Sequence, residues 1–126
     1  MQNAILVGIG GFFGSIARYL MGLLVYRFFD APTFPYATLL VNVLGCLAIG
    51  FIGTLAERSD IIQTPVRVFL IIGLLGGFTT FSAFGYETLA LARDGRMLHA
   101  LWNVAAQVVL GLCAVWFGMA AAAKLA

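Results

Sequence analysis

The stretch from Gly73 to Phe84 reads GLLGGFTTFSAF and lies inside a long apolar segment of the chain. Hydrocarbon offers no water to backbone groups, so a membrane span normally remains one continuous helix. Two adjacent glycines, Gly76 and Gly77, weaken a helix, and the hydroxyls that follow them compete for backbone partners. A break of this kind is tolerated where it is buried in protein or lines a site for ions or substrate. We therefore expect this span to be broken at mid-membrane, and we expect the function at the break.

The composition of the whole chain is that of a membrane protein. Of its 126 residues, 63% are hydrophobic and 10% are charged, whereas a soluble domain carries about 25% charged residues. The chain has four long apolar segments, and each is at least as long as the roughly 20 residues that a helix needs to cross the hydrocarbon. The sequence predicts one all-α domain over residues 1–126, and no basic tract indicates nucleic acid. Its four spans cover about residues 4–26, 36–56, 66–92 and 98–123.

Lysines and arginines are divided evenly between the two sides of the predicted bundle. The side that holds both termini carries Arg58, Arg67 and Lys124, and the other side carries Arg27, Arg93 and Arg96. The positive-inside rule counts these residues, so three against three gives no preferred orientation. Either a determinant outside this count decides the orientation, or the chain inserts both ways and pairs antiparallel. The second interpretation is favoured, because four helices alone can hardly enclose a pathway and shield it from lipid.

The first span carries a stripe of small residues and one arginine. Gly10, Gly14, Arg18 and Gly22 recur every four residues, and glycines at this spacing let another helix approach closely. A guanidinium inside a span is costly unless it pairs or reaches water. Arg18 either extends to an interface or faces a water-filled vestibule, where it raises the local anion concentration.

Neutral polar side chains line the second and fourth spans. Thr38 and Asn42 share a face of one helix, and Asn103 and Gln107 share a face of the other. Such amides often hydrogen-bond neighbouring helices and do no more. Several of them together indicate a polar track, and the absence of an ionisable group along these stripes argues against a proton relay.

Two phenylalanines follow the predicted break. Phe81 and Phe84 are three residues apart, so their rings share one helix face. Rings in a membrane helix usually pack in the core or against lipid. Here the hydroxyls of Thr79, Thr80 and Ser82 surround them, and the positive edge of an aromatic ring can hold a small anion beside such donors. A site without a fixed charge lets the ion leave again, as conduction requires.

These motifs resemble those of the Fluc/CrcB family of small fluoride channels. The Gly73–Phe84 stretch is the strongest match, and it is supported by TLLVNVLG from Thr38 to Gly45 and by GGFFGSIARY from Gly10 to Tyr19. The three motifs stand in the same order on four spans, and the similarity covers essentially the whole chain.

The resemblance implies an antiparallel, dual-topology homodimer with two fluoride pores in the bacterial inner membrane. It also implies a structural sodium ion at the dimer centre, held by the backbone carbonyls of Gly76 and Thr79. It places Phe81, Phe84, Asn42 and other polar residues in the pore and Arg18 in the vestibule; the other pore residues are Thr38, Thr80, Ser82 and Gln107. The chain departs from the family at Ala83 and Gly111, which leaves Gln107 as the expected lining of the fourth helix.

A small multidrug exporter is the competing class, since it is also short, four-span and dual-topology. Proton-coupled export needs an ionisable group deep in a span. The first two predicted spans contain no acid, and Glu87 is expected near the end of the third, as a solvated interfacial side chain. We therefore expect a passive channel and not an enzyme or a coupled exporter.

Overall fold

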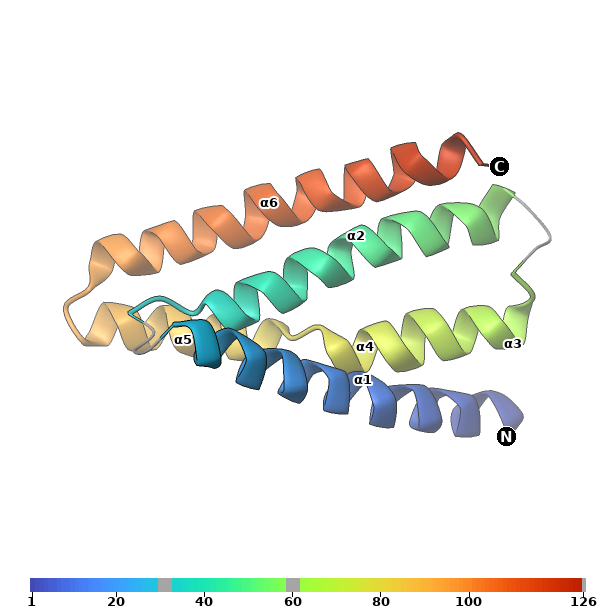
Figure 1. Ribbon diagram of the computed structural model, residues 1–126, viewed down its shortest axis with the longest axis horizontal. Coiled ribbons are helices and arrows are strands. Elements are labelled where there is room, and N and C mark those ends of the chain that lie inside the picture. The colour runs from blue at the N-terminus through green and yellow to red at the C-terminus, as the bar shows by residue number, and fades with distance from the viewer. Residues whose placement is uncertain (30–32, 59–61, 126) are drawn as a thin grey trace.

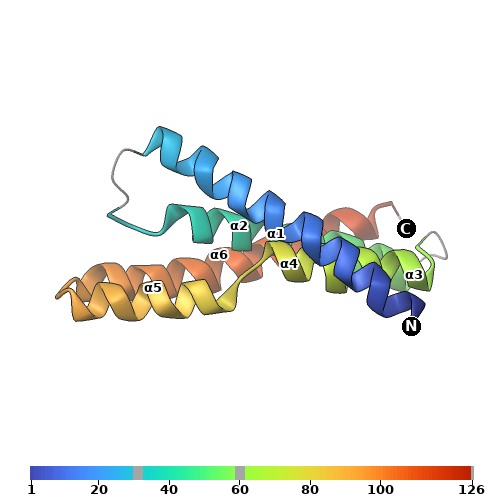
Figure 2. The ribbon, with the colours of Figure 1, turned by 90° about the horizontal axis from the view of Figure 1, so that it is seen from below.

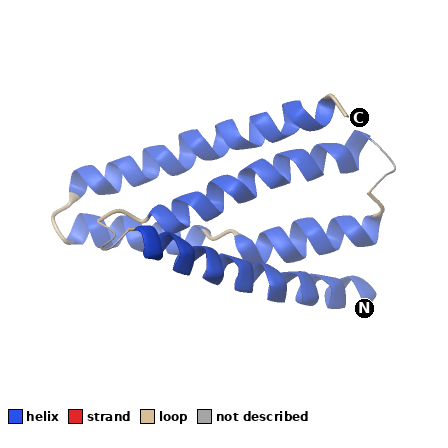
Figure 3. Cartoon of the chain, viewed as in Figure 1, coloured by secondary structure: helices blue, strands red, loops and turns tan. Residues whose placement is uncertain are grey.

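The computed structural model describes residues 1–29, 33–58 and 62–125, all of them in helices or short connections (Figure 3). Four helical segments in this part of the chain are long and apolar enough to cross a membrane, and their ends differ from the predicted bounds by at most two residues. Three are single helices. They are α1 (Gln2–Phe28), α2 (Tyr36–Arg58) and α6 (Met97–Ala123).

The third span is composed of several pieces. It begins with α3 (Thr64–Arg67), continues as the π-helix η1 (Val68–Leu75) and the short α4 (Gly76–Phe78), and ends with α5 (Phe81–Arg93). Thr79 and Thr80 join α4 to α5 in an extended conformation. Figure 2 shows this link as an extended stretch of chain between α4 and α5.

The helices form two closely packed pairs. Helix α2 runs along α6, and α1 packs against η1 and α4. The N- and C-termini lie at the same end of the bundle (Figure 1). Helix α5 packs against α6 at the other end. The two halves of the third span therefore have different neighbours, which places the extended link at the centre of the bundle.

Glycines allow α1 to contact the third span backbone to backbone. A Cβ atom on Gly10 would lie 2.6 Å from the carbonyl oxygen of Phe69, and one on Gly77 would lie 2.6 Å from the carbonyl oxygen of Gly11. Gly14 makes a similar contact, with a Cβ position 2.9 Å from the backbone nitrogen of Phe78. The predicted close approach therefore holds for Gly10 and Gly14. It does not hold for Gly22, around whose Cβ position the described residues leave open space to 4 Å.

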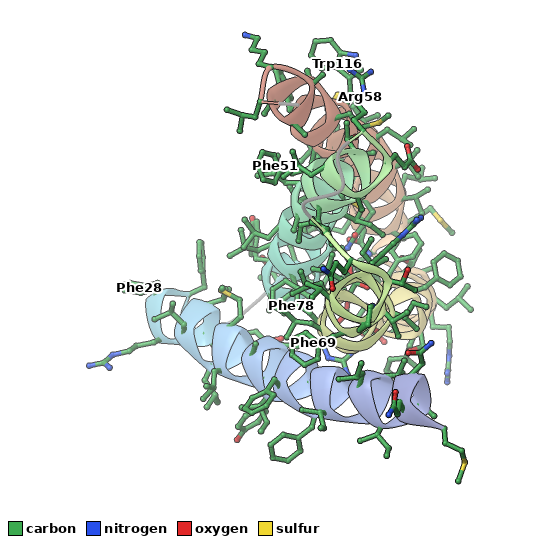
Figure 4. The ribbon with its side chains drawn as sticks, turned by 90° about the vertical axis from the view of Figure 1, so that its right-hand side faces the viewer. Phe28, Phe51, Arg58, Phe69, Phe78 and Trp116 are labelled. Carbon is green, nitrogen blue, oxygen red and sulfur yellow. The ribbon has the colours of Figure 1, made fainter. Side chains whose placement is uncertain are left out.

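The single chain has a thin core and a large apolar surface. Its buried hydrophobic side chains are no larger than leucine in the described residues. Large side chains point outward on several helices, and Figure 4 shows Phe28 and Trp116 at the periphery, where they are 75% and 63% exposed. Such a surface is stable only against hydrocarbon or another apolar surface.

Candidate functional site

The interruption between α4 and α5 lies at Thr79 and Thr80, after the two glycines. Gly76 keeps helical backbone angles (φ −62°, ψ −38°), whereas Thr79 (φ −82°, ψ 160°) and Thr80 (φ −152°, ψ 114°) are extended. The Thr80 hydroxyl begins the next helix by accepting a hydrogen bond of 3.1 Å from the Ala83 amide. This is the usual action of a threonine N-cap.

Asn42 of α2 satisfies the extended backbone. Its Oδ1 accepts from the Thr80 amide at 2.8 Å, and its Nδ2 donates to the Thr80 carbonyl at 3.0 Å. In a continuous helix the Thr80 amide would donate to the Gly76 carbonyl, and the Ala83 amide would donate to the Thr79 carbonyl. Both amides bond side chains instead. The interruption thus removes the helical donors of the carbonyls of Gly76 and Thr79.

Arg18 of α1 reaches the same link. Its Nη1 donates to the Thr79 carbonyl over 3.3 Å. Its partner is therefore a backbone oxygen of the extended link, and this bond offsets part of the cost of a guanidinium within a span. Arg18 also lines a second cavity of about 200 Å³, together with Thr38, Thr80 and Ala83.

A cavity of about 410 Å³ opens beside the link, and we call it the break cavity. Phe81 and Phe84 both line it, and the centroids of their rings are 5.5 Å apart with their planes inclined at 61°. Phe81 is 83% exposed in the single chain, and Phe84 is half-buried. The polar lining comes from α2, from α6 and from the extended link. The residues that carry it are Asn42, Thr79, Thr80 and Gln107.

Gln107 of α6 meets Asn42 at this cavity. The Nδ2 of Asn42 donates to the Oε1 of Gln107 at 3.0 Å. The Nε2 of Gln107 is buried and has no hydrogen-bond partner among the described residues. The cavity is therefore lined by two phenylalanines and by neutral side-chain amides.

The predicted site residues divide between the two cavities. The residues that line the break cavity include Asn42, Gly76, Thr79, Thr80, Phe81, Phe84 and Gln107. Thr38 and Arg18 line the smaller cavity, which shares Thr80 with the first. Ser82 is exposed, and its hydroxyl lies 3.2 Å from that of Thr80.

Glu87 differs from its expected environment. It is half-buried, its Oε1 accepts from the Thr38 hydroxyl at 2.7 Å, and its Oε2 is buried without a partner in the described part of the chain. It is therefore not the solvated interfacial acid that its position near the end of a span suggests. The sequence signal for a buried Glu87 was the polar residue Thr38 on α2. The pairing itself could not be predicted, because it depends on how α2 and α5 are rotated against each other.

A second polar contact joins α5 to α6. Asn103 is fully buried, and its Nδ2 donates to the Thr88 hydroxyl at 2.9 Å, which in turn donates to the Phe84 carbonyl at 2.7 Å. Asn103 shares the predicted polar stripe with Gln107. Thr88 was not predicted, because a threonine in a helix commonly bonds the carbonyl four residues earlier.

Oxygen atoms are the available ligands for a cation near the link. The described residues contain no cluster of three or more histidine, cysteine, aspartate or glutamate side chains that could hold a metal. The Gly76 and Thr79 carbonyls are of the kind that hard cations prefer. The Thr79 carbonyl accepts from Arg18 with one lone pair and keeps a second.

Comparison with known proteins identifies relatives over nearly the whole chain. The chain is 44% identical over 118 residues to the "Fluoride-specific ion channel FluC" of Methylobacillus flagellatus, covering 94% of this chain and 92% of the relative. It is 47% identical over 118 residues to the protein of that name from Chlorobaculum tepidum, with the same coverage. It is 43% identical over 122 residues to that of Geotalea daltonii, covering 97% and 98%.

The family model described as "CrcB-like protein, Camphor Resistance (CrcB)" matches residues 5–119, which include every residue that lines the break cavity. Four apolar helices and channel relatives together make the chain a multi-pass membrane protein. The predicted resemblance is confirmed, and the chain belongs to the CrcB family.

Proposed function

We propose that the chain is a fluoride-selective ion channel that lets fluoride leave the cell passively and so prevents its toxic accumulation. The observation that carries this proposal is the break cavity, where the rings of Phe81 and Phe84 lie beside the neutral amide of Gln107. The relatives are named as fluoride-specific ion channels, which are not enzymes.

The chemistry of the lining suits a small anion that must move on. Ring edges carry partial positive charge, and amide hydrogens donate to an anion without a formal charge of their own. A lysine or arginine in the same place would bind the anion more tightly and slow its release. Arg18 lines the second cavity, where its charge can attract anions toward the link.

The functional unit in this proposal is an antiparallel homodimer with dual topology and two pores. It lies in the bacterial inner membrane, and its outer surface contacts lipid. The balanced lysines and arginines support two orientations. Phe81 is 83% exposed in the single chain, so one chain would enclose an anion beside this ring from one side only. This exposure supports a second subunit. A partner chain would complete the wall that one chain leaves open.

A central sodium ion fits the residues at the link. The Gly76 and Thr79 carbonyls have lost their helical donors, and the same pair from a partner subunit would supply four oxygen ligands on a two-fold axis. The ion would offset the partial negative charge of these carbonyls where the two broken spans meet at mid-membrane. Arg18 already lies against one of them, so the ion and the guanidinium would share the Thr79 oxygen.

Reconstitution into liposomes tests the channel. Purified protein in fluoride-loaded vesicles should release fluoride down its gradient when a potassium ionophore balances the charge. Release that requires a pH gradient would favour coupled exchange, the mechanism of the multidrug exporter class. The relatives are named as fluoride-specific ion channels, which does not favour that second class.

A further inference from the structure

We propose that Thr88 is a positioning residue, and that its hydroxyl, held by Asn103, fixes the place of the Phe84 ring in the break cavity. The inference rests on the proposed function, because the place of this ring matters to conduction only if an anion enters the cavity. Thr88 lines neither the break cavity nor the smaller cavity beside Arg18. It therefore acts through Phe84 and not by contact with the anion.

The directions of the two hydrogen bonds of Thr88 follow from the chemistry of the groups. A carbonyl oxygen can only accept, so the Thr88 hydroxyl donates its one hydrogen to the Phe84 carbonyl, at 2.7 Å. The hydroxyl can then only accept from Asn103, so the amide atom that lies 2.9 Å away is the donor, Nδ2. The two bonds form a chain that runs from α6 to the backbone of α5.

Asn103 supplies a buried anchor for this chain. Its side chain has no exposed surface, and it lies on α6, which packs against α5. A threonine in a helix divides between two rotamers, because its hydroxyl can bond either of two carbonyls in the preceding turn. A buried amide donor that loses its acceptor is unfavourable, so Asn103 favours the rotamer of Thr88 that is observed.

The Phe84 carbonyl connects this chain to the cavity. In an α-helix it accepts from the amide four residues later, so the Thr88 hydroxyl is a second donor on the same residue. Hydroxyls bonded in this way often bend a helix. Phe84 lines the break cavity, with its ring centroid 5.5 Å from that of Phe81. A change of bend at Phe84 would therefore move one ring relative to the other.

Fluorine NMR measures the place of the ring without measuring transport. We consider para-fluorophenylalanine in place of Phe84 in the full chain in lipid, where its one resonance reports the surroundings of that ring. Thr88→Val keeps the shape of the side chain and removes the hydroxyl, so the resonance should shift or split. Thr88→Ser keeps the hydroxyl and should restore the wild-type spectrum. The same label in place of Phe51, toward the other end of α2, should respond to neither variant.

A double-mutant cycle tests the other end of the chain. Asn103→Leu leaves Thr88 intact and removes the amide that holds it, so the Phe84 resonance should again shift. Adding Thr88→Val to this variant should shift the resonance little further, because the two residues act in series. Additive shifts would overturn the role of Asn103 as the anchor.

Fluoride flux from liposomes, measured on unlabelled protein, tests the consequence for conduction. Thr88→Val should slow this flux by about 2- to 10-fold, the range that one neutral hydrogen bond spans. Thr88→Ser should conduct at the wild-type rate. Thr54→Val is the matched control, because Thr54 is also a buried threonine but lies toward the far end of α2; it should leave the flux unchanged.

The readouts separate a positioning role from a general structural one. An unchanged Phe84 resonance in Thr88→Val, a Thr88→Ser variant that fails to restore it, or an equal change at Phe51 would overturn the proposal. So would a shifted resonance with wild-type flux. If Thr88→Val does not assemble, Asn103→Leu decides by the same measurements. A shifted resonance in a protein whose wild type releases no fluoride would support the positioning of the ring and reject the channel.

Discussion

The two phenylalanine rings of the break cavity differ from aliphatic packing residues in how their charge is distributed. Phe81 and Phe84 meet edge to face, and both residues line the cavity to which Gln107 also contributes. An aliphatic side chain fills similar volume but has no positive edge. In the proposed channel the rings would therefore supply electrostatic stabilisation of the anion that size and hydrophobicity alone do not provide.

Substitution of either ring by isoleucine should slow fluoride flux by about tenfold or more, since each 1.4 kcal/mol of lost anion stabilisation is a factor of ten. Phe81→Ile and Phe84→Ile are measured in liposomes, with size-exclusion chromatography to show that assembly is intact. If both variants assemble and conduct at the wild-type rate, the rings only pack and the anion passes elsewhere.

The charge of Arg18 can be separated from its hydrogen bond. Glutamine carries no charge and ends two bonds short of the Nη1 that contacts the Thr79 carbonyl, so Arg18→Gln removes both the charge and this contact. If the charge is what matters, the variant should lower fluoride flux by weakening anion entry. The loss should shrink as salt rises, because the screening length falls from about 30 Å at 0.01 M to about 10 Å at 0.1 M. A loss that is the same at every salt concentration would show that the guanidinium acts on the backbone and not on the approaching anion.

At the scale of the helices, bare glycine backbones determine how α1 meets the third span. A Cβ on Gly10 would lie 2.6 Å from the Phe69 oxygen, 2.8 Å from the Leu74 nitrogen and 2.9 Å from the Gly73 Cα. All three are backbone atoms, which cannot move aside as the end of a side chain can. The position of η1 and α4, and so of the link that follows them, depends on this contact.

Gly10→Ala should therefore destabilise the protein by about 1–3 kcal/mol, the usual cost of overpacking, and should reduce flux by displacing the link. Gly8→Ala is the control on the same helix, since its Cβ would have open space to 4 Å among the described residues. Thermal unfolding in detergent compares the two. Equal melting temperatures would mean that α1 adjusts without moving the third span.

The elements were predictable to different degrees, for physical reasons. The four spans could be predicted, because a membrane-spanning helix is recognised from the length and composition of an apolar run alone. The glycines Gly76 and Gly77 pointed to the interruption, but both remain helical and the extended residues are Thr79 and Thr80, because Asn42 bonds the Thr80 backbone.

Pairings between helices were harder to predict than the helices themselves. The contacts Asn42–Gln107 and Thr38–Glu87 join residues 65 and 49 positions apart. They depend on the rotation of each helix about its axis, which periodicity alone does not give. The π-helix η1 had no sequence signal beyond the glycines that bring it against α1.

For the molecule as a whole, we expect charge balance to determine how the chain is oriented in the membrane. Three lysines and arginines on each side leave the chain without a strong bias. Two lysines added to the 57–66 loop should hold that loop in the cytoplasm, and two added to the 93–97 loop should give the opposite orientation. Each variant alone should lose activity, and co-expression of the two should restore it.

Cysteine labelling from outside intact cells scores these orientations. A reporter cysteine is placed in one loop after the two native cysteines, Cys46 and Cys113, are replaced. A variant with a single orientation and full activity would contradict the antiparallel dimer, since only opposite orientations complete it.

The central claim is selective passive conduction of fluoride, and a fluoride electrode outside loaded proteoliposomes measures it most directly. With a potassium ionophore present and no pH gradient, the wild-type protein should release its fluoride, while vesicles loaded with chloride should retain theirs. Chloride release at a comparable rate, or fluoride that stays trapped until a pH gradient is imposed, would contradict the claim.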